Sequence, residues 1–439
     1  MSESDGAELS CRLAGVSLAA PASPLEDDDL LREILLRLPP QPSSLPRASA
    51  VCKGWSGLVT DPKFARSFSA HHWKPPLLGF FEIRNHLLVF TQVMDPPDRI
   101  PPERFDLGPC NANQEDHVFS CRHGRVVVID FERLEFLVCT PITGERSRVA
   151  LLPEVNPNFI RVAVLCAAAD QGHVHGACHS NPFKLVSLCM GREDNQVLAR
   201  VYSSQTGAWG NLISAPAPFR LDYDGTPETL VGNALYWLCP IVDVVKFDLD
   251  DHSLTVFKGP PDRCGRRVVQ AEDGDIGFNM FTYPRCEMWR RNADYHGVAD
   301  TWVLWKTVEM HTILALPPPQ ADEERLNFVI GYCEDTEAFF IYVKPSVYMV
   351  QLKAMQSKRL DDLDCVNIYR PFTSFYTPGD FSFFVLLYCA QVLLVDLPEL
   401  QFRTTHSRTL FDVVKEWLLQ FSLSLAGNDV AWKTYRALV

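Results

Sequence analysis

The stretch SPLEDDDLLREILLRLPP (residues 23–40), followed by LPRASAVCKGW (residues 45–55), decides how this chain is organised. Apolar residues recur three or four positions apart in the first stretch, with charged residues between them: Leu30, Leu31, Ile34, Leu35 and Leu38. This spacing predicts a short amphipathic helix. Ser23 and Glu26 can form a capping box at its start, and the Pro39-Pro40 pair ends it because proline lacks an amide hydrogen.

A second apolar series continues at helical spacing until Asp61-Pro62: Leu45, Ala48, Val51, Cys52, Trp55, Leu58 and Val59. Together the two series predict two or three small helices over residues 24–68. A unit this small can bury only a limited core by itself. We therefore expect part of its apolar surface to pack against a partner protein.

The order and spacing of these residues resemble an F-box, through Pro24-Leu25, Asp29-Leu30-Leu31, Glu33-Ile34-Leu35, Arg37-Leu38-Pro39, Leu45, Arg47, Val51-Cys52-Lys53, Trp55 and Asp61-Pro62-Lys63-Phe64. F-box proteins are the substrate receptors of SCF-type ubiquitin ligases. The resemblance implies that residues 23–70 dock a Skp-type adaptor, which bridges to a cullin. It also implies the adaptor-binding anchors, some of which must instead hold the module together: Leu25, Leu30, Leu31, Ile34, Leu35, Leu38, Val51, Cys52 and Trp55. The alternative is an ordinary helical hairpin packed on its own domain.

Two glycines depart from the F-box pattern in the last predicted helix. Gly54 and Gly57 stand where the family has bulkier, often basic residues. A glycine inside a helix costs about 1 kcal/mol relative to alanine. We therefore expect a weaker last helix and weaker adaptor binding.

Composition favours an intracellular chain of two or three domains. The 439 residues are 47% apolar and 22% charged, as in ordinary globular proteins. The 14 cysteines include no C-x-x-C pair, and no N-x-S/T acceptor site is present, so we expect cytoplasmic or nuclear localisation. Residues 1–22 are small and polar and predict a disordered leader rather than a signal peptide.

The negative charge of the chain is concentrated in its middle. Residues 77–380 carry 28 basic and 40 acidic side chains, which accounts for about −12 of the net −13. Nucleic-acid-binding proteins instead gather Lys and Arg on one face. We therefore expect no nucleic-acid partner, and a protein partner of basic character is more plausible.

Short β-type runs separated by turn residues fill this middle region. Examples are 125–130, 134–140, 201–209, 235–238, 244–249, 253–257, 302–305, 328–331, 338–343 and 348–352. Turns at Thr143-Gly144, Thr206-Gly207 and Asp250-Asp251 recur at about the 40–60-residue period of four-stranded propeller blades. The pattern predicts a mainly-β, propeller-like domain of about six blades. A pair of large β-sandwiches is the alternative.

Several phrases of the region resemble the F-box-associated propeller-like domains of the large F-box family of grasses: Cys121-Arg-His-Gly-Arg-Val, Val201-Tyr-Ser-Ser, Gly207-Ala-Trp209, Gly232-Asn-Ala-Leu-Tyr-Trp237, Phe247-Asp-Leu, Asp273-Gly-Asp-Ile-Gly277, Trp302-Val-Leu-Trp305 and Gly331-Tyr-Cys-Glu-Asp335. The resemblance covers residues 77–380 and implies a domain that holds a protein substrate. Function on a propeller lies in loops at one end of the blades. The sequence does not identify which loops bind the substrate.

Four other groups of residues have simple structural interpretations. His173, His175, Cys178 and His179 could ligate zinc, but no second Cys/His pair stands at finger spacing, so we predict a solvated loop and no metal site. Turn formation accounts for the carboxylates of residues 248–251. Glu26 to Asp29 are explained by the favourable interaction of carboxylates with the helix dipole at the start of a helix. Packing between blades accounts for Trp209, Trp237, Trp289, Trp302 and Trp305.

The C-terminal residues 381–439 resemble nothing in either family pattern. Residues 381–397 are strongly apolar but interrupted by Gln391 and Asp396, and they predict a buried strand or helix rather than a membrane anchor. Residues 408–439 predict a helix. This segment is expected to form an apolar run and a partly helical tail.

The sequence therefore predicts a non-catalytic substrate receptor of an SCF-type ligase, with no cofactor. No phosphate-binding glycine loop, H-E-x-x-H or G-x-S-x-G motif is present. Two alternatives remain open. One is an enzyme acting on a small molecule or glycan at the propeller centre. The other is an F-box scaffold that works outside a ligase.

Overall fold

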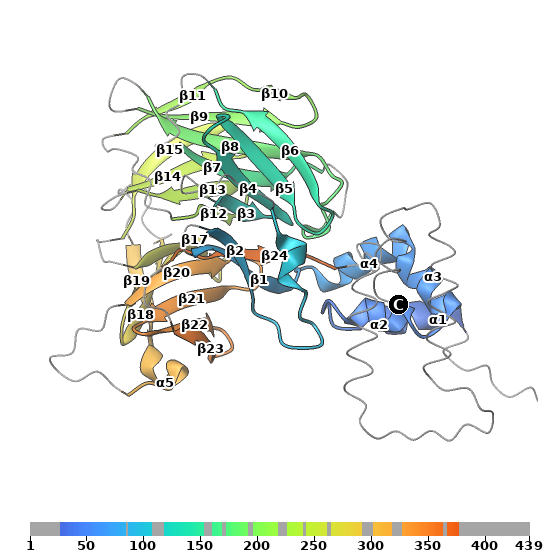
Figure 1. Cartoon of the computed structure of the whole chain (residues 1–439). Helices are drawn as coiled ribbons and strands as arrows, with labels where there is room; N and C mark the ends of the chain where they lie inside the picture. Colours follow the sequence, from blue (N-terminus) through green and yellow to red (C-terminus); the bar gives the residue numbers. More distant parts are fainter. Residues whose placement is uncertain are drawn as a thin grey trace, which may run out of the picture.

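A computed structural model describes residues 27–84, 87–107, 118–152, 160–168, 173–191, 196–217, 226–239, 243–260, 265–291, 302–317, 327–362 and 367–376. Four helices form a small module, which lies at one side of a β-propeller (Figure 1). The predictions for residues 1–22 and for the tail at 381–439 lie outside the described residues. None of the described helices is long and apolar enough to span a membrane.

The helical module contains α1 (Asp28–Leu36), α2 (Ser44–Ser49), α3 (Lys53–Thr60) and α4 (Pro62–His72). The N-cap of α1 is Asp27, whose carboxylate accepts hydrogen bonds from the amides of Asp29 (3.0 Å) and Leu30 (3.1 Å). The predicted Ser23–Glu26 capping box lies outside the described residues, and the described helix begins four residues later in the chain than Pro24, at Asp28. The aspartate run itself begins the helix, because one carboxylate satisfies two free amides and the next two acidic residues favour the helix dipole. The predicted stop at the two prolines is confirmed.

The sequence interpretation missed α4. Asp61-Pro62, predicted to end the second apolar series, does end α3 but also begins another helix. Asp61 caps it by accepting a hydrogen bond from the amide of Lys63 at 2.9 Å, and Pro62 stands in its first turn. Phe64 and Phe68 of α4 complete the module core, with Leu31, Leu35, Leu45, Ala48 and Val59.

Replacing Gly57 by alanine is expected to stabilise α3. An added Cβ would meet nothing within 4 Å, and the residue lies in regular helix. The gain should be about 0.5–1 kcal/mol, which amide hydrogen exchange of α3 will measure. Gly79→Ala in β1 (Leu77–Arg84) is the contrasting variant, because its Cβ would come closer than van der Waals contact to the carbonyl oxygen of Thr91. Unchanged or faster exchange in Gly57→Ala would contradict the expectation that this glycine weakens the helix.

The propeller has six blades, as the turn period predicted. Blade 1 contains β1, β2 (Leu87–Gln92) and β24 (Arg370–Thr373). Blade 2 contains β3 (Val118–Arg122), β4 (Arg125–Asp130), β5 (Glu135–Thr140) and β6 (Glu145–Ala150). Blade 3 contains β7 (Ile160–Cys166), β8 (Phe183–Met190), β9 (Gln196–Ser203), β10 (Ala208–Trp209) and β11 (Ile213–Pro216).

Blades 4 to 6 are four-stranded antiparallel meanders. Blade 4 contains β12 (Thr229–Val231), β13 (Ala234–Leu238), β14 (Asp243–Asp248) and β15 (Ser253–Lys258). Blade 5 contains β16 (Arg266–Gln270), β17 (Ile276–Thr282), β18 (Arg285–Arg291) and β19 (Trp302–Glu309), and α5 (Met310–Leu314) follows it. Blade 6 contains β20 (Asn327–Cys333), β21 (Ala338–Val343), β22 (Ser346–Gln351) and β23 (Gln356–Asp362).

The ring is closed by pairing its two ends in one blade. β24, from the end of the domain, is antiparallel to β1, with Phe80 opposite Pro371 and Phe81 opposite Arg370. The rings of Phe80 and Tyr369 stack at 3.8 Å beside this seam. This pairing gives the first and last strands of the domain a partner in one blade and so joins the two ends of the ring.

Apolar clusters between blades hold the ring together. Trp237 is fully buried between blades 3 and 4, Trp209 packs between blades 2 and 3, and Trp289 and Trp302 pack between blades 4 and 5. The packing role predicted for these four tryptophans is confirmed. Trp305 differs, because it is 42% exposed on β19, the outer strand of blade 5.

Buried arginines also form hydrogen bonds between neighbouring blades. These contacts were not predicted from the sequence. Arg161 of blade 3 donates to the carbonyl of Leu238 in blade 4 at 2.9 Å. Arg267 of blade 5 donates to the carbonyl of Val329 in blade 6 at 2.7 Å. Each guanidinium thereby donates a hydrogen bond to a backbone carbonyl of the next blade.

Candidate functional site

The helix α1 presents two apolar rows, and only one of them faces the module core. Leu31 and Leu35 are 3% and 1% exposed within that core, so they hold the module together. Leu30 and Ile34, one turn apart, are 50% and 41% exposed. Since a helix that serves its own fold needs only one apolar row, the second row indicates a surface for another molecule.

The predicted anchors thus fall into three groups. Val51 (61% exposed) and Cys52 lie open at the connection from α2 to α3, and with Leu30 and Ile34 they form what we call the docking surface. Leu38 and Trp55 are half-buried against the module core. Leu31 and Leu35 belong to that core, and Leu25 lies outside the described residues. The structure therefore narrows the adaptor-binding prediction to the four members of the docking surface and the exposed parts of Leu38 and Trp55.

The module core continues into the propeller. Phe375, which follows β24, is 1% exposed within it, and Val174 and Ala177 of the β7–β8 connection pack against it. Gly176 between them has a φ of 108°, and a Cβ there would come within 2.7 Å of the Pro75 side chain. This close packing fixes the module against the propeller, and Figure 1 shows the four helices on the side of the ring where β1 and β24 lie.

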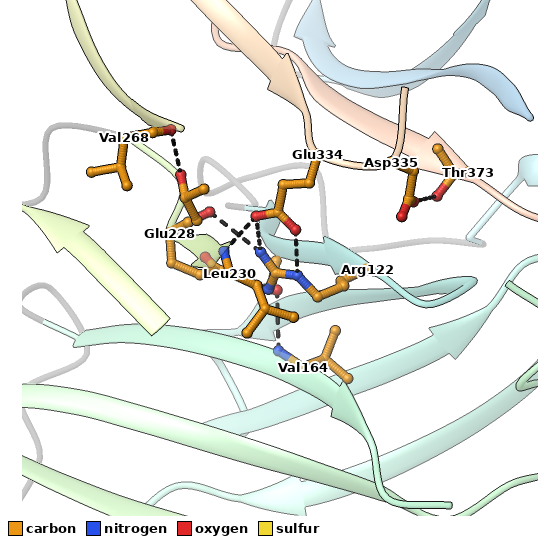
Figure 2. A network of polar contacts seen from close by, with 10 residues as sticks. Arg122, Val164, Glu228, Leu230, Val268, Glu334, Asp335 and Thr373 are labelled. Atoms are coloured by element: carbon orange, nitrogen blue, oxygen red, sulfur yellow. Dashed lines mark hydrogen bonds and ion pairs between the residues drawn. The ribbon is translucent and has the colours of Figure 1, made fainter. Parts of the chain in front are cut away.

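A network of polar side chains crosses the centre of the propeller (Figure 2). Arg122 leaves the innermost strand β3 of blade 2, Glu228 precedes the innermost strand β12 of blade 4, and Glu334 follows the innermost strand β20 of blade 6. Arg122 donates to Glu228 at 2.6 Å and to the two carboxylate oxygens of Glu334 at 2.6 and 3.0 Å. Since these are alternate blades of a six-blade ring, the three side chains meet across the propeller axis.

The remaining three blades join the same network. Ser120 donates to Glu228 at 2.6 Å and accepts from the amide of Val164 in blade 3 at 3.1 Å. Thr229 donates to the carbonyl of Val268 in blade 5 at 3.2 Å. Thr373 of blade 1 donates to Asp335, next to Glu334. We call this set of contacts the axial network.

The charged side chains of the axial network are stabilised by direct contacts with one another rather than by solvent. Burial raises the pKa of Glu228 above its ordinary value of 4.5, although the Arg122 charge opposes this effect. Burial would lower the pKa of Arg122, but the charges of Glu334 and Glu228 raise it. Burial also raises the pKa of Asp335. The guanidinium therefore remains charged, and its bidentate contacts are what allow carboxylates to lie at the axis.

These carboxylates bear on the alternative of a propeller enzyme. Glu228 and Glu334 meet on Arg122 at the centre of the ring, whereas Asp335 points to Thr373 (Figure 2). Each is nevertheless held by the hydrogen bonds and ion pairs of the axial network, which join blades to one another. The contacts of the axial network therefore give each of these carboxylates a structural role in joining blades.

A hollow of about 320 Å³ lies between blades 5 and 6. Its lining combines an exposed aromatic, Trp305, with charges of both signs on Arg290, Glu337 and Lys353. The Arg290 guanidinium lies 5.2 Å from the centroid of the Trp305 ring. The residues that line it come from six strands and the turns between them, so no local sequence pattern indicates the hollow.

The predicted turn role of the acidic cluster after β14 is confirmed. Asp248 accepts hydrogen bonds from the amides of Asp250 (3.1 Å) and Asp251 (3.3 Å). A hydrogen bond from Lys246 lowers the pKa of Asp248. These carboxylates therefore form the β14–β15 turn at the propeller surface.

The solvated loop predicted for His173 to His179 was wrong in part. Cys178 is completely buried, and it lies with His173 and His175 around Cys166, the last residue of β7. His179 is not a member of this group and lies against Gly124. Cys166 was missed because it ends β7, seven positions before the His and Cys run at 173–179.

Family models match both the helical module and the propeller of this chain. The helical module matches the F-box domain over residues 27–67, and the fold and module together define an F-box protein with a β-propeller. The chain belongs to the family described as F-box protein AT5G49610-like, beta-propeller, whose model matches residues 117–378. Origin in grasses stays a prediction. No curated protein matches the chain.

Solved structures resemble this chain only weakly. The Dos1 propeller is 9% identical over 60% of this chain and 71% of that one, with a TM-score of 0.31. A PQQ-bound aldose sugar dehydrogenase from Streptomyces coelicolor is 10% identical over 56% and 81%, with a TM-score of 0.32. The extracellular domain of a one-component system from B. thetaiotaomicron is 14% identical over 57% of this chain and 29% of that one, with a TM-score of 0.28. These similarities carry no information on function.

Proposed function

We propose that this chain is the substrate-recognition subunit of an SCF-type ubiquitin ligase. The observation that carries the proposal is the second apolar row of α1, because Leu30 and Ile34 face away from a module core that is already complete. The F-box match at residues 27–67 supports the assignment of a Skp-type adaptor to that surface. Through the adaptor the chain would reach a cullin.

The propeller supplies specificity rather than chemistry in this proposal. Its polar centre is occupied by contacts between blades, and the hollow beside Trp305 is the candidate surface for a protein segment. Ubiquitin transfer is then the work of other subunits, and the chain is a non-catalytic receptor in the cytoplasm or nucleus. The acidic balance of residues 77–380 favours a substrate of basic character.

Reconstitution tests the proposal directly. The full chain is co-expressed with a Skp-type adaptor, a cullin and its RING subunit, and the complex is isolated through a tag on the chain. We expect all three partners to be recovered at equal stoichiometry. Recovery of the adaptor without the cullin would instead support a scaffold outside a ligase, and recovery of neither would overturn the proposal.

A further inference from the structure

The connection between β7 and β8 brings two thiols and two imidazoles to one point. Cys166 ends β7, and His173, His175 and Cys178 follow on the connection. One ligand-type atom of each lies within 4.8 Å of the others. The Nε2 atom of His173 is 3.4 Å from the sulfur of Cys166 and 3.2 Å from that of Cys178, and the Nδ1 atom of His175 is 3.6 Å from the latter.

These separations match the edges of a zinc tetrahedron. With Zn–S near 2.3 Å and Zn–N near 2.05 Å, a tetrahedral site places S and N about 3.5 Å apart. The three S···N distances span this value, and a set of two sulfurs and two nitrogens in tetrahedral order is typical of zinc. We propose that Cys166, His173, His175 and Cys178 bind one Zn²⁺ ion.

The surroundings hold the four ligands in place. The ring of His123 stacks on that of His175 with 3.7 Å between centroids, and its Nδ1 accepts a hydrogen bond from the amide of Cys166 at 3.0 Å. The amide of Ala168 donates to the sulfur of Cys166 at 3.4 Å. Outer contacts of this kind orient metal ligands and tune their basicity. Two thiolates also neutralise the charge of the ion, which suits a site beside the fully buried Cys178.

The position of the cluster gives the metal a structural role. Val174 and Ala177, which alternate with the ligands along the connection, pack against the F-box core. The carbonyl of Gly176 accepts hydrogen bonds from the hydroxyl of Ser374 (2.9 Å) and the amide of Phe375 (3.0 Å). A zinc ion would link this connection to the end of β7. It would thereby stabilise the propeller surface that packs against the F-box module.

Metal content of the full chain tests the site. The chain is purified under reducing conditions without chelator and analysed by elemental mass spectrometry, with about one zinc per chain expected. The double variant Cys166→Ser/Cys178→Ser should lose the metal. Cys189→Ser, on β8 outside the cluster, is the matched control and should keep it. A folded wild-type chain without metal, or a double variant that retains it, would overturn the proposal.

Cobalt substitution tests the geometry without relying on a variant that folds. The full chain loaded with Co²⁺ should show the intense visible bands of a tetrahedral ion and a thiolate-to-cobalt band in the near ultraviolet. Bands of a six-coordinate ion without the thiolate band would contradict a Cys₂His₂ site. Mass spectrometry of the alkylated wild-type chain should find Cys166 and Cys178 as thiols, and a disulfide between them would also overturn the proposal.

Hydrogen exchange tests the structural role. Removing the metal with a chelator should accelerate amide exchange in residues 173–181 and leave the turn at Asp250-Asp251 unchanged. Loss of the metal with unchanged exchange in residues 173–181 would show that the ion does not support the junction.

Discussion

Replacing Ile34 by aspartate is expected to weaken binding of the full chain to a Skp-type adaptor by at least about 100-fold, or about 3 kcal/mol. The side chain is 41% exposed on the outward row of α1, so the loss falls on the interface rather than on the module core. A charge there would be desolvated without a partner when the adaptor closes over it. Titration calorimetry with the purified adaptor measures the change.

Two variants separate binding from folding in this experiment. Leu212→Asp introduces the same charge at an aliphatic residue of similar exposure, 52%, on the propeller, and adaptor affinity should be unchanged. Ile34→Asp itself should alter the stability of the chain by no more than about 0.5 kcal/mol, because exposed substitutions seldom do more. Equal adaptor affinity of the Ile34 and Leu212 variants would remove Ile34 from the docking surface.

Replacing Arg122 by methionine is expected to destabilise the propeller by about 3–5 kcal/mol. The side chain of Arg122 is 7% exposed and that of Glu228 is 3% exposed, so the variant leaves a buried carboxylate without its cation. Blades 2, 4 and 6 also lose their direct link across the axis. Denaturant unfolding of the full chain measures the loss, and a loss under about 1 kcal/mol, the range of exposed ion pairs, would contradict a stabilising axial network.

The loss should depend on pH in a defined direction. The folded-state pKa of Glu228 already lies above 4.5, and it rises further once the charge of Arg122 is removed. Between 4.5 and that raised pKa, the folded variant holds a proton that the unfolded chain does not, so its stability increases as pH falls through this window. The deficit relative to wild type should be largest at neutral pH and shrink on acidification.

An exposed arginine provides the matched control. Arg148 pairs with Glu135 at 3.1 Å, but its side chain is 47% exposed. Arg148→Met should therefore cost no more than about 1 kcal/mol. A deficit as large as that of Arg122→Met would show that loss of any arginine, rather than loss of the axial contacts, explains the result.

The F-box helices and the blade count could be predicted because their signals are local. The spacing of Leu31 and Leu35 reports an inward helix face, and turn residues such as Gly144 and Gly207, both with positive φ, mark where strands reverse. The predicted end of the second apolar series at Asp61-Pro62 is confirmed, but α4 was missed because an Asp-Pro pair can end one helix and begin the next. The same sequence pattern could not separate Leu30 from Leu31, because burial depends on what packs against α1.

The amino-acid sequence by itself determined that this chain has a small helical docking module before a propeller of about six blades, since periodicity and turn chemistry are properties of neighbouring residues. Only the tertiary structure decided what meets at the axis and at the junction. Arg122 and Glu334 are 212 positions apart, and the fold of the β7–β8 connection brings His173 and Cys178 to Cys166. Ring closure brings the first pair together and the path of the connection the second group, and neither leaves a periodic trace in the chain.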